Sequence, residues 1–135
     1  MKFLFVSICI LKKNKKLLFT KRPAKKYYGG FWEFPGGKLE ANETFEDAIV
    51  RELKEELGIV AKQEDLKTID IVNHSYDNKT FIIMNVFFLE KWLKQIKNKE
   101  IQDYKWISID DKFPDNFLDG GLLILKRIKN GYYDI

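Results

Sequence analysis

Apolar residues along the chain form short runs that are separated by polar or glycine-containing segments. Most runs are rich in β-branched and aromatic residues, which is typical of strands. Residues 3–11 are almost entirely apolar and predict a buried strand, and residues 12–16, with Asn14 in the middle, predict a hairpin turn. Residues 122–129 predict an amphipathic helix. The further expected strands are residues 17–20, 66–76, 80–90 and 104–109.

A second helix is predicted at residues 44–57. Thr44 and Asp47 have the spacing of a capping box, and Asn42 is an alternative N-cap. Gly58 provides a stop at the C-terminal end. At helical spacing, one stripe is apolar and should face a core. That stripe consists of Ile49, Val50, Leu53 and Leu57. Short strands interleaved with two helices predict an α/β fold in one domain that spans residues 1–135.

The same helix carries three glutamates, Glu52, Glu55 and Glu56, on a stripe beside the apolar one. Like charges at these spacings repel by about a few tenths of a kcal/mol per pair in an isolated helix. A stripe of carboxylates beside a buried face therefore calls for a cation, and carboxylate oxygens suit Mg²⁺ or Mn²⁺. The alternative is a solvated acidic face with Arg51 and Lys54 as salt-bridge partners.

Composition limits the possible partners. The net charge of +4 attracts anionic substrates, but the lysines lie in scattered clusters without a recognisable nucleic-acid motif. We therefore expect no stable nucleic acid complex. No apolar run approaches the roughly 20 residues that span a bilayer, so no membrane contact is expected. Cys9 is the single cysteine and is expected in the core, which fits a reducing, cytoplasmic setting.

Two segments resemble a known family. The spacing of residues 37–59 matches the Nudix box at every fixed position, and WEFPGGK at residues 32–38 is similar to the approach to that box in MutT-type nucleoside triphosphate pyrophosphatases. The matched box positions are Gly37, Glu43, Arg51, Glu52, Leu53, Glu55, Glu56, Gly58 and Ile59. The resemblance covers nearly the whole chain. It implies the Nudix fold, a mixed β-sheet sandwiched between α-helices.

The resemblance also implies a metal site for Mg²⁺, with Mn²⁺ as a possible substitute. Its expected ligands are the Gly36 carbonyl, Glu52, Glu55 and Glu56. Either Glu52 or Glu56 is a candidate general base. Arg51 is expected to hold a carboxylate in place, Glu43 to support the loop, and Lys38 to lie near the phosphates.

Substrate contacts are implied at several further positions. The candidates are Arg22, Tyr27, Glu33, Phe34, Pro35, Asn116 and Asp119. The resemblance implies that Arg22 binds substrate phosphate, because a guanidinium can donate two parallel hydrogen bonds to phosphate oxygens. Phe34 would contact the base. Asn116 and Asp119 are alternatives for reading the base edge, and the Gly120-Gly121 pair replaces the proline that relatives often have nearby.

The expected activity is hydrolysis of a small-molecule nucleotide by a monomer or homodimer. For a triphosphate, water attacks phosphorus and releases nucleoside monophosphate and pyrophosphate. The WEFPGGK approach favours an oxidised purine nucleotide such as 8-oxo-dGTP, and CTP, ADP-ribose or a dinucleoside polyphosphate are alternatives. A nucleotide-sensing or RNA-binding module on a degenerate Nudix fold is the non-enzymatic alternative.

Overall fold

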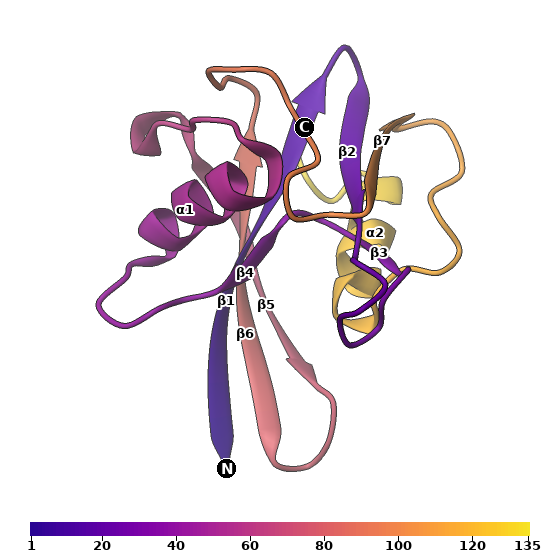
Figure 1. Ribbon diagram of the computed structural model, residues 1–135. Helices are drawn as coiled ribbons and strands as arrows, with labels where there is room; N and C mark the ends of the chain where they lie inside the picture. The colour runs from indigo at the N-terminus through magenta and orange to yellow at the C-terminus, as the bar shows by residue number, and fades with distance from the viewer.

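The computed structural model describes residues 1–135 and consists of seven strands and two α-helices (Figure 1). The elements in chain order are β1 (Lys2–Lys13), β2 (Lys16–Lys21), β3 (Trp32–Glu33), β4 (Gly36–Lys38), α1 (Phe45–Leu57), β5 (Lys67–Ser75), β6 (Thr80–Leu89), β7 (Asp103–Ser108) and α2 (Leu122–Lys129). Every helix and strand expected from the sequence pattern is present, with ends within two residues of the expected ones. The short strands β3 and β4 were not expected.

The sheet is mixed, as expected. Its centre is the parallel pair β1 and β6, which runs from Lys2 opposite Thr80 to Leu11 opposite Leu89. Strand β5 is antiparallel to β6, and β4 is antiparallel to the middle of β1. The chain leaves β1 through a hairpin turn at Asn14 and Lys15, which have φ angles of 52° and 64°. Strand β2 then pairs antiparallel with β3 and β7.

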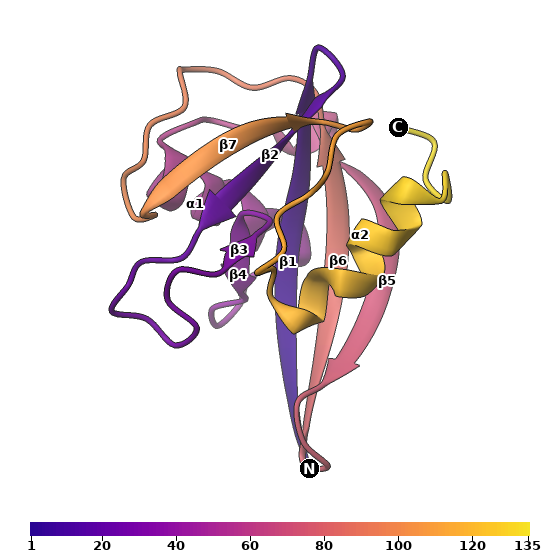
Figure 2. The same cartoon turned by 90° about the vertical axis from the view of Figure 1, so that its right-hand side faces the viewer.

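The two helices lie on opposite faces of the sheet, which confirms the expected sandwich (Figures 1 and 2). Because side chains alternate across a strand, Cys9 and Leu11 of β1 pack into the core under α1. Ile8 and Ile10 of the same strand pack into the core under α2. Cys9 is fully buried, as expected, and burial raises the pKa of its thiol. Neither helix has the length and apolar character that crossing a membrane requires.

Strand β1 is buried only in its second half. Residues Ser7 to Leu11 are buried, whereas Phe3 and Phe5 are 52% and 46% exposed. Figure 1 shows the reason, because β1, β5 and β6 extend beyond the part of the sheet that the helices cover. The expectation of a strand buried along its whole length is therefore wrong at its N-terminal end.

Helix α1 is fixed at both ends by its sequence. The Thr44 hydroxyl accepts a hydrogen bond from the Asp47 N–H (3.0 Å), and the Asp47 carboxylate accepts one from the Thr44 N–H (3.1 Å). Thr44 is thus the N-cap rather than Asn42. Gly58 closes the other end with φ 70°, and its N–H donates to the Lys54 carbonyl. Because the apolar stripe is buried against the sheet, the rotation of α1 about its axis is fixed, and with it the side toward which the neighbouring glutamates point. The fully buried stripe residues are Ile49, Leu53 and Leu57.

The segment between β6 and β7 was expected to be an exposed excursion. Most of its side chains are exposed, but its main chain has a structural role. The N–H groups of Lys97 and Lys99 donate to the carbonyls of Leu57 and Glu56, at 2.8 and 3.0 Å. Terminal carbonyls of a helix otherwise lack partners. The segment therefore wraps the C-terminal end of α1 and brings Glu100 beside it.

Candidate active site

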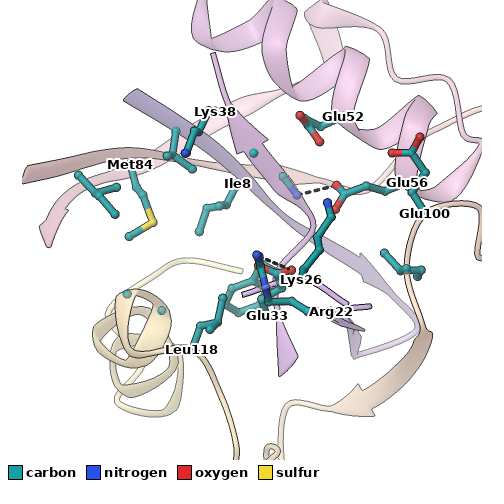
Figure 3. A pocket seen from close by; sticks show the side chains of 18 of the residues that line it. Ile8, Arg22, Lys26, Glu33, Lys38, Glu52, Glu56, Met84, Glu100 and Leu118 are labelled. Carbon is teal, nitrogen blue, oxygen red and sulfur yellow. Dashed lines mark hydrogen bonds and ion pairs between the residues drawn. The ribbon is translucent and has the colours of Figure 1, made fainter. Parts of the chain in front are cut away.

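A cavity of about 550 Å³ opens between α1, the middle of the sheet and the segment before α2 (Figure 3). Its volume lies in the range of small-molecule sites. The charged residues that line the cavity are Arg22, Lys26, Glu33, Lys38, Glu40, Arg51, Glu52, Glu56 and Glu100. Its apolar lining residues include Ile8, Phe34, Ile82, Met84, Phe117 and Leu118. Figure 3 shows Glu52, Glu56 and Glu100 on one side of the cavity and Met84 and Leu118 on the other, so the cavity has an acidic end and an apolar end.

Three carboxylates in the cavity have raised pKa values. Glu56 is 9% exposed, and its Oε2 accepts a hydrogen bond from the Gly36 N–H at 2.9 Å. Burial, followed by repulsion from Glu33 and Glu52, raises the pKa of Glu56 well above its ordinary value. Burial also raises the pKa of Glu52 and of Glu33. Burial therefore disfavours the charged form of each of these three carboxylates.

Arg51 donates hydrogen bonds to three acidic side chains, those of Glu43, Glu52 and Glu55. Its Nε and Nη2 donate to the two oxygens of Glu43, at 2.7 and 2.9 Å. Its Nη1 donates to Glu52 (2.8 Å) and to Glu55 (3.2 Å), and its Nη2 also reaches the Lys38 carbonyl (3.0 Å). These bonds, chiefly those to Glu43, raise the pKa of Arg51. One guanidinium therefore joins α1, β4 and the loop between them, and fixes how Glu52 is oriented.

The donor groups fit a hard divalent cation. Glu52 and Glu56 both line the cavity, beside the main chain of Gly36. Carboxylate and carbonyl oxygens are the ligands of Mg²⁺, which often uses only one or two carboxylates together with water and phosphate oxygens. No three acidic, histidine or cysteine side chains form a ready-made metal cluster in this structure. Glu55 does not line the cavity, and its side chain is 42% exposed beside Arg51.

Arg22 lines the cavity but is already bound. Its Nη1 donates to both oxygens of Glu33, at 3.1 and 3.2 Å, and its Nε donates to the Tyr27 carbonyl at 3.0 Å. The Arg22 charge opposes the effect of burial on the pKa of Glu33. The structure therefore brings Arg22 and Glu33 together as a pair at the edge of the cavity. Tyr27 is 80% exposed and does not line the cavity.

Some residues of the WEFPGGK segment pack in the core, some line the cavity, and Phe34 does both. Phe34 is 3% exposed, lines the cavity, and packs against Phe19 and Phe117 with ring centroids 5.3 Å apart in each case. Pro35 lies outside the cavity, and its carbonyl accepts a hydrogen bond from the Cys9 N–H at 2.9 Å. Lys38 lines the cavity with an exposed side chain.

Neither candidate for reading the base edge lines the cavity. The Asn116 side chain donates to the Gly30 carbonyl at 3.1 Å, and Asp119 is exposed. Their neighbours Leu118 and Gly120 do line it. The segment before α2 therefore lines the cavity through Leu118, Gly120 and Gly121, and the base-reading role of Asn116 or Asp119 stays a prediction.

Sequence reasoning missed several cavity residues. Ile82 and Met84 point into the cavity from alternate positions of β6, so the period-two pattern of that strand carried the signal. Lys26 and Glu100 reach it from irregular segments, where no periodicity indicates direction. Tyr76, just after β5, lines the cavity in the same way.

Comparisons with known proteins identify the family and agree with the fold. A family model described as NUDIX domain matches residues 1–125. An 8-oxo-dGTP diphosphatase from Proteus vulgaris is 42% identical over 91 residues, which cover 67% of this chain and 79% of that protein. A CTP pyrophosphohydrolase from Escherichia coli is 48% identical over 61 residues, 45% of either chain. The solution structure of the E. coli ORF135 protein has a TM-score of 0.79 at 28% identity, and covers 93% of this chain and 88% of that one. The chain therefore belongs to the Nudix family of pyrophosphohydrolases and is similar to its MutT-like members.

Proposed function

We propose that the protein hydrolyses nucleoside triphosphates to the monophosphate and pyrophosphate, with an oxidised purine deoxynucleotide such as 8-oxo-dGTP as its preferred substrate. The observation that supports this proposal is the two-ended cavity, which has buried carboxylates at one end and aromatic and aliphatic side chains at the other. The named activity of the P. vulgaris relative supports the choice of base.

At the charged end, Glu52 and Glu56 are the proposed ligands of a divalent ion, with the Gly36 carbonyl as a further donor. Nudix hydrolases generally use divalent ions, and such an ion supplies positive charge for the phosphates and lowers the pKa of water. Glu55 was expected as a third ligand, and in that role it would have to leave Arg51 and turn inward. Glu100, on the same wall as Glu56, is a further acidic candidate.

The chemical step needs a group that accepts the proton of the attacking water. Glu52 and Glu56 are the two candidates, because burial raises both pKa values and a general base works best near the operating pH. Water then attacks phosphorus and pyrophosphate leaves. Lys38 and Arg22, which both line the cavity, are the proposed ligands of phosphate oxygens, and Arg22 would share its guanidinium between the phosphate and Glu33.

At the apolar end, Phe34, Ile82, Met84 and Leu118 form the proposed surface for the base. A cytidine nucleotide is the second candidate substrate. The 48% identity to the E. coli CTP pyrophosphohydrolase over 61 residues favours it.

The test is a pyrophosphate-release assay with Mg²⁺ across the NTPs, the dNTPs and 8-oxo-dGTP. ADP-ribose and a dinucleoside polyphosphate are followed by their nucleotide products. The inactivated control is Glu56→Gln, which keeps an oxygen to accept the Gly36 hydrogen bond. The matched control is Glu46→Gln, on the same helix but outside the cavity.

Preferential turnover of 8-oxo-dGTP by the wild type and Glu46→Gln, but not by Glu56→Gln, is the expected result. A preference for cytidine nucleotides would keep the mechanism and change the base. Absence of turnover on the whole panel would contradict the enzymatic proposal. It would favour a nucleotide-sensing or RNA-binding module, which is then tested by ligand-induced shifts in melting temperature.

A further inference from the structure

Tyr76 differs in chemistry from every other residue that lines the cavity. The remaining lining residues are charged, apolar or glycine, so Tyr76 is the single uncharged residue there with a hydrogen-bonding side chain. It directly follows the end of β5 at Ser75 and is 46% exposed. A phenolic hydroxyl can donate and accept hydrogen bonds while it stays neutral. Tyr76 is therefore the side chain of the cavity that can contact a ligand through a neutral polar group.

The Tyr76 hydroxyl lies near the apolar end of the cavity. A Cβ at position 120 would lie 3.4 Å from the Tyr76 hydroxyl oxygen and 3.4 Å from the Met84 Cε, so both groups are beside Gly120. Figure 3 places Met84 and Leu118 at the apolar end. The Tyr76 ring packs edge-on against the His74 ring, with centroids 4.5 Å apart and an interplanar angle of 84°. Contacts with β5, β6 and the segment before α2 therefore position the hydroxyl.

The Tyr76 hydroxyl is available to a ligand as a hydrogen-bond donor. The buried Tyr133 donates its hydroxyl to Asp70 at 2.6 Å, whereas the Tyr76 hydroxyl forms no hydrogen bond with another protein group. Burial, followed by the nearby charge of Asp119, raises the pKa of Tyr76 above its ordinary value of about 10. The hydroxyl therefore keeps its proton at neutral pH, and an acceptor atom on a ligand would match it.

Gly120 leaves the space that the hydroxyl needs. A Cβ at this position would already touch both the Tyr76 hydroxyl and the Met84 methyl group. A larger side chain would have to displace one of the two. The glycine therefore keeps the hydroxyl open to the cavity.

We infer that Tyr76 is a specificity-determining residue, whose hydroxyl donates a hydrogen bond to a carbonyl oxygen on the edge of the nucleotide base. The inference rests on the proposed function, because that function places the base at the apolar end. Guanine carries a carbonyl oxygen at C6 where adenine carries an amino group, and an 8-oxo purine carries another at C8. A phenol is a better donor than acceptor, because its oxygen lone pair is conjugated with the ring. Tyr76 would therefore favour bases with a carbonyl group over adenine.

The test is the dissociation constant of three nucleoside monophosphates with Mg²⁺, measured by titration calorimetry. The probes are dGMP, 8-oxo-dGMP and the 2-aminopurine deoxynucleotide, which is dGMP without its C6 oxygen. Tyr76→Phe keeps the ring and removes the hydroxyl. It should weaken binding of dGMP and 8-oxo-dGMP by about 5-fold, the usual effect of one lost hydrogen bond, and leave the 2-aminopurine nucleotide unaffected. Weakening of 8-oxo-dGMP alone would assign the hydrogen bond to the C8 oxygen and equally support the inference.

Tyr132→Phe is the matched control, because Tyr132 is 63% exposed and lies outside the cavity. It should bind all three nucleotides like the wild type. Wild-type binding of all three by Tyr76→Phe would overturn the inference. Equal weakening of all three, together with a lower melting temperature, would indicate a purely structural role and would also overturn it.

Gly120→Val tests the space beside the hydroxyl. Its side chain should displace the hydroxyl and produce the same selective loss as Tyr76→Phe. Unchanged selectivity in this variant would overturn the role given to Gly120. If the wild type binds the monophosphates with this dependence on Tyr76 but hydrolyses no triphosphate, the proposed function fails and the inference stands. A wild type that binds none of the three would overturn the inference as well.

Discussion

The Glu52 carboxylate occupies the space that a side chain at Gly37 would need. A Cβ at position 37 would lie 2.6 Å from both Cδ and Oε1 of Glu52, which is closer than real Cβ contacts. Gly37 belongs to β4 and Glu52 to α1, and Arg51 holds the same Oε1 at 2.8 Å. Only a glycine at position 37 therefore leaves room for the Glu52 carboxylate in the position that Arg51 holds.

Gly37→Ala should displace Glu52 from the cavity. The new methyl group meets the carboxylate rather than a flexible apolar side chain, so we expect turnover to fall at least about 10-fold with a modest loss of stability, of about 1–3 kcal/mol for overpacking. The measurement is kcat with saturating Mg²⁺, together with a melting curve. Wild-type turnover in this variant would show that the position of Glu52 does not matter for the reaction.

Glu56→Gln should make the metal-free protein more stable at neutral and alkaline pH. Burial and carboxylate repulsion raise the pKa of Glu56 in the folded protein, so the native state binds more protons than the unfolded chain above the ordinary glutamate pKa of about 4.3. The free energy of unfolding therefore falls as pH rises through the raised pKa. Near pH 4.5 the two proteins should unfold alike.

The measurement for Glu56→Gln is the melting temperature from pH 4.5 to 8 with a chelator present. At pH 8 the variant should melt about 3–8 °C above the wild type, since about 1 kcal/mol shifts the melting temperature by a few degrees for a chain of this size. Glu46→Gln, which lies outside the cavity, should follow the wild type. A variant that melts below the wild type at pH 8 would contradict the destabilising effect assigned to the buried negative charge of Glu56.

Arg51→Lys should impair both activity and stability. Lysine keeps the charge but cannot reproduce the planar fork that binds Glu43 through two oxygens and also reaches Glu52 and the Lys38 carbonyl. We expect a loss of about 1–3 kcal/mol in the free energy of unfolding, together with reduced kcat, because partly buried carboxylates lose partners. Urea denaturation and steady-state kinetics measure the two effects. Lys54→Arg on the same helix serves as a control, and full activity of Arg51→Lys would refute the orienting role.

Asp70→Asn should weaken the attachment of α2 without affecting the reaction. The Asp70 Oδ2 accepts hydrogen bonds from Arg127 (2.5 Å) and from the Tyr133 hydroxyl (2.6 Å), and none of the three residues lines the cavity. Burial acts to raise the pKa of Asp70, but these partners outweigh it and lower the pKa. The stability contributed by the charge is therefore present at neutral pH and is lost as pH falls through that lowered pKa.

For Asp70→Asn we expect about 1–3 kcal/mol of destabilisation at pH 7, the usual effect on a hydrogen-bonded charge that loses its partners. Chemical denaturation at pH 7 and at pH 3 measures it, and the difference from the wild type should shrink at the lower pH. A large change in kcat or KM would show that α2 shapes the cavity more directly than these contacts indicate.

The sequence by itself determined both helices, the five longer strands and the match of residues 37–59 to the Nudix box. The capping pair Thr44 and Asp47, the stop at Gly58 and the apolar stripe of α1 are local features, because each depends on residues a few positions apart. The strands followed from their apolar runs in the same way. Local spacing likewise placed the glutamates on one side of α1.

Only the tertiary structure decided which charges meet. Glu52 and Glu56 face the cavity, whereas Glu55 stays outside it. The orientation of α1 on the sheet and the hydrogen bond from Arg51 to Glu55 decide which of these neighbouring glutamates points inward. The parallel pairing of β1 with β6, and the arrival of Glu33, Glu100 and Lys26 at the same cavity, join segments far apart in the chain. Such contacts depend on how the sheet and its connections close around the core, which local periodicity does not encode.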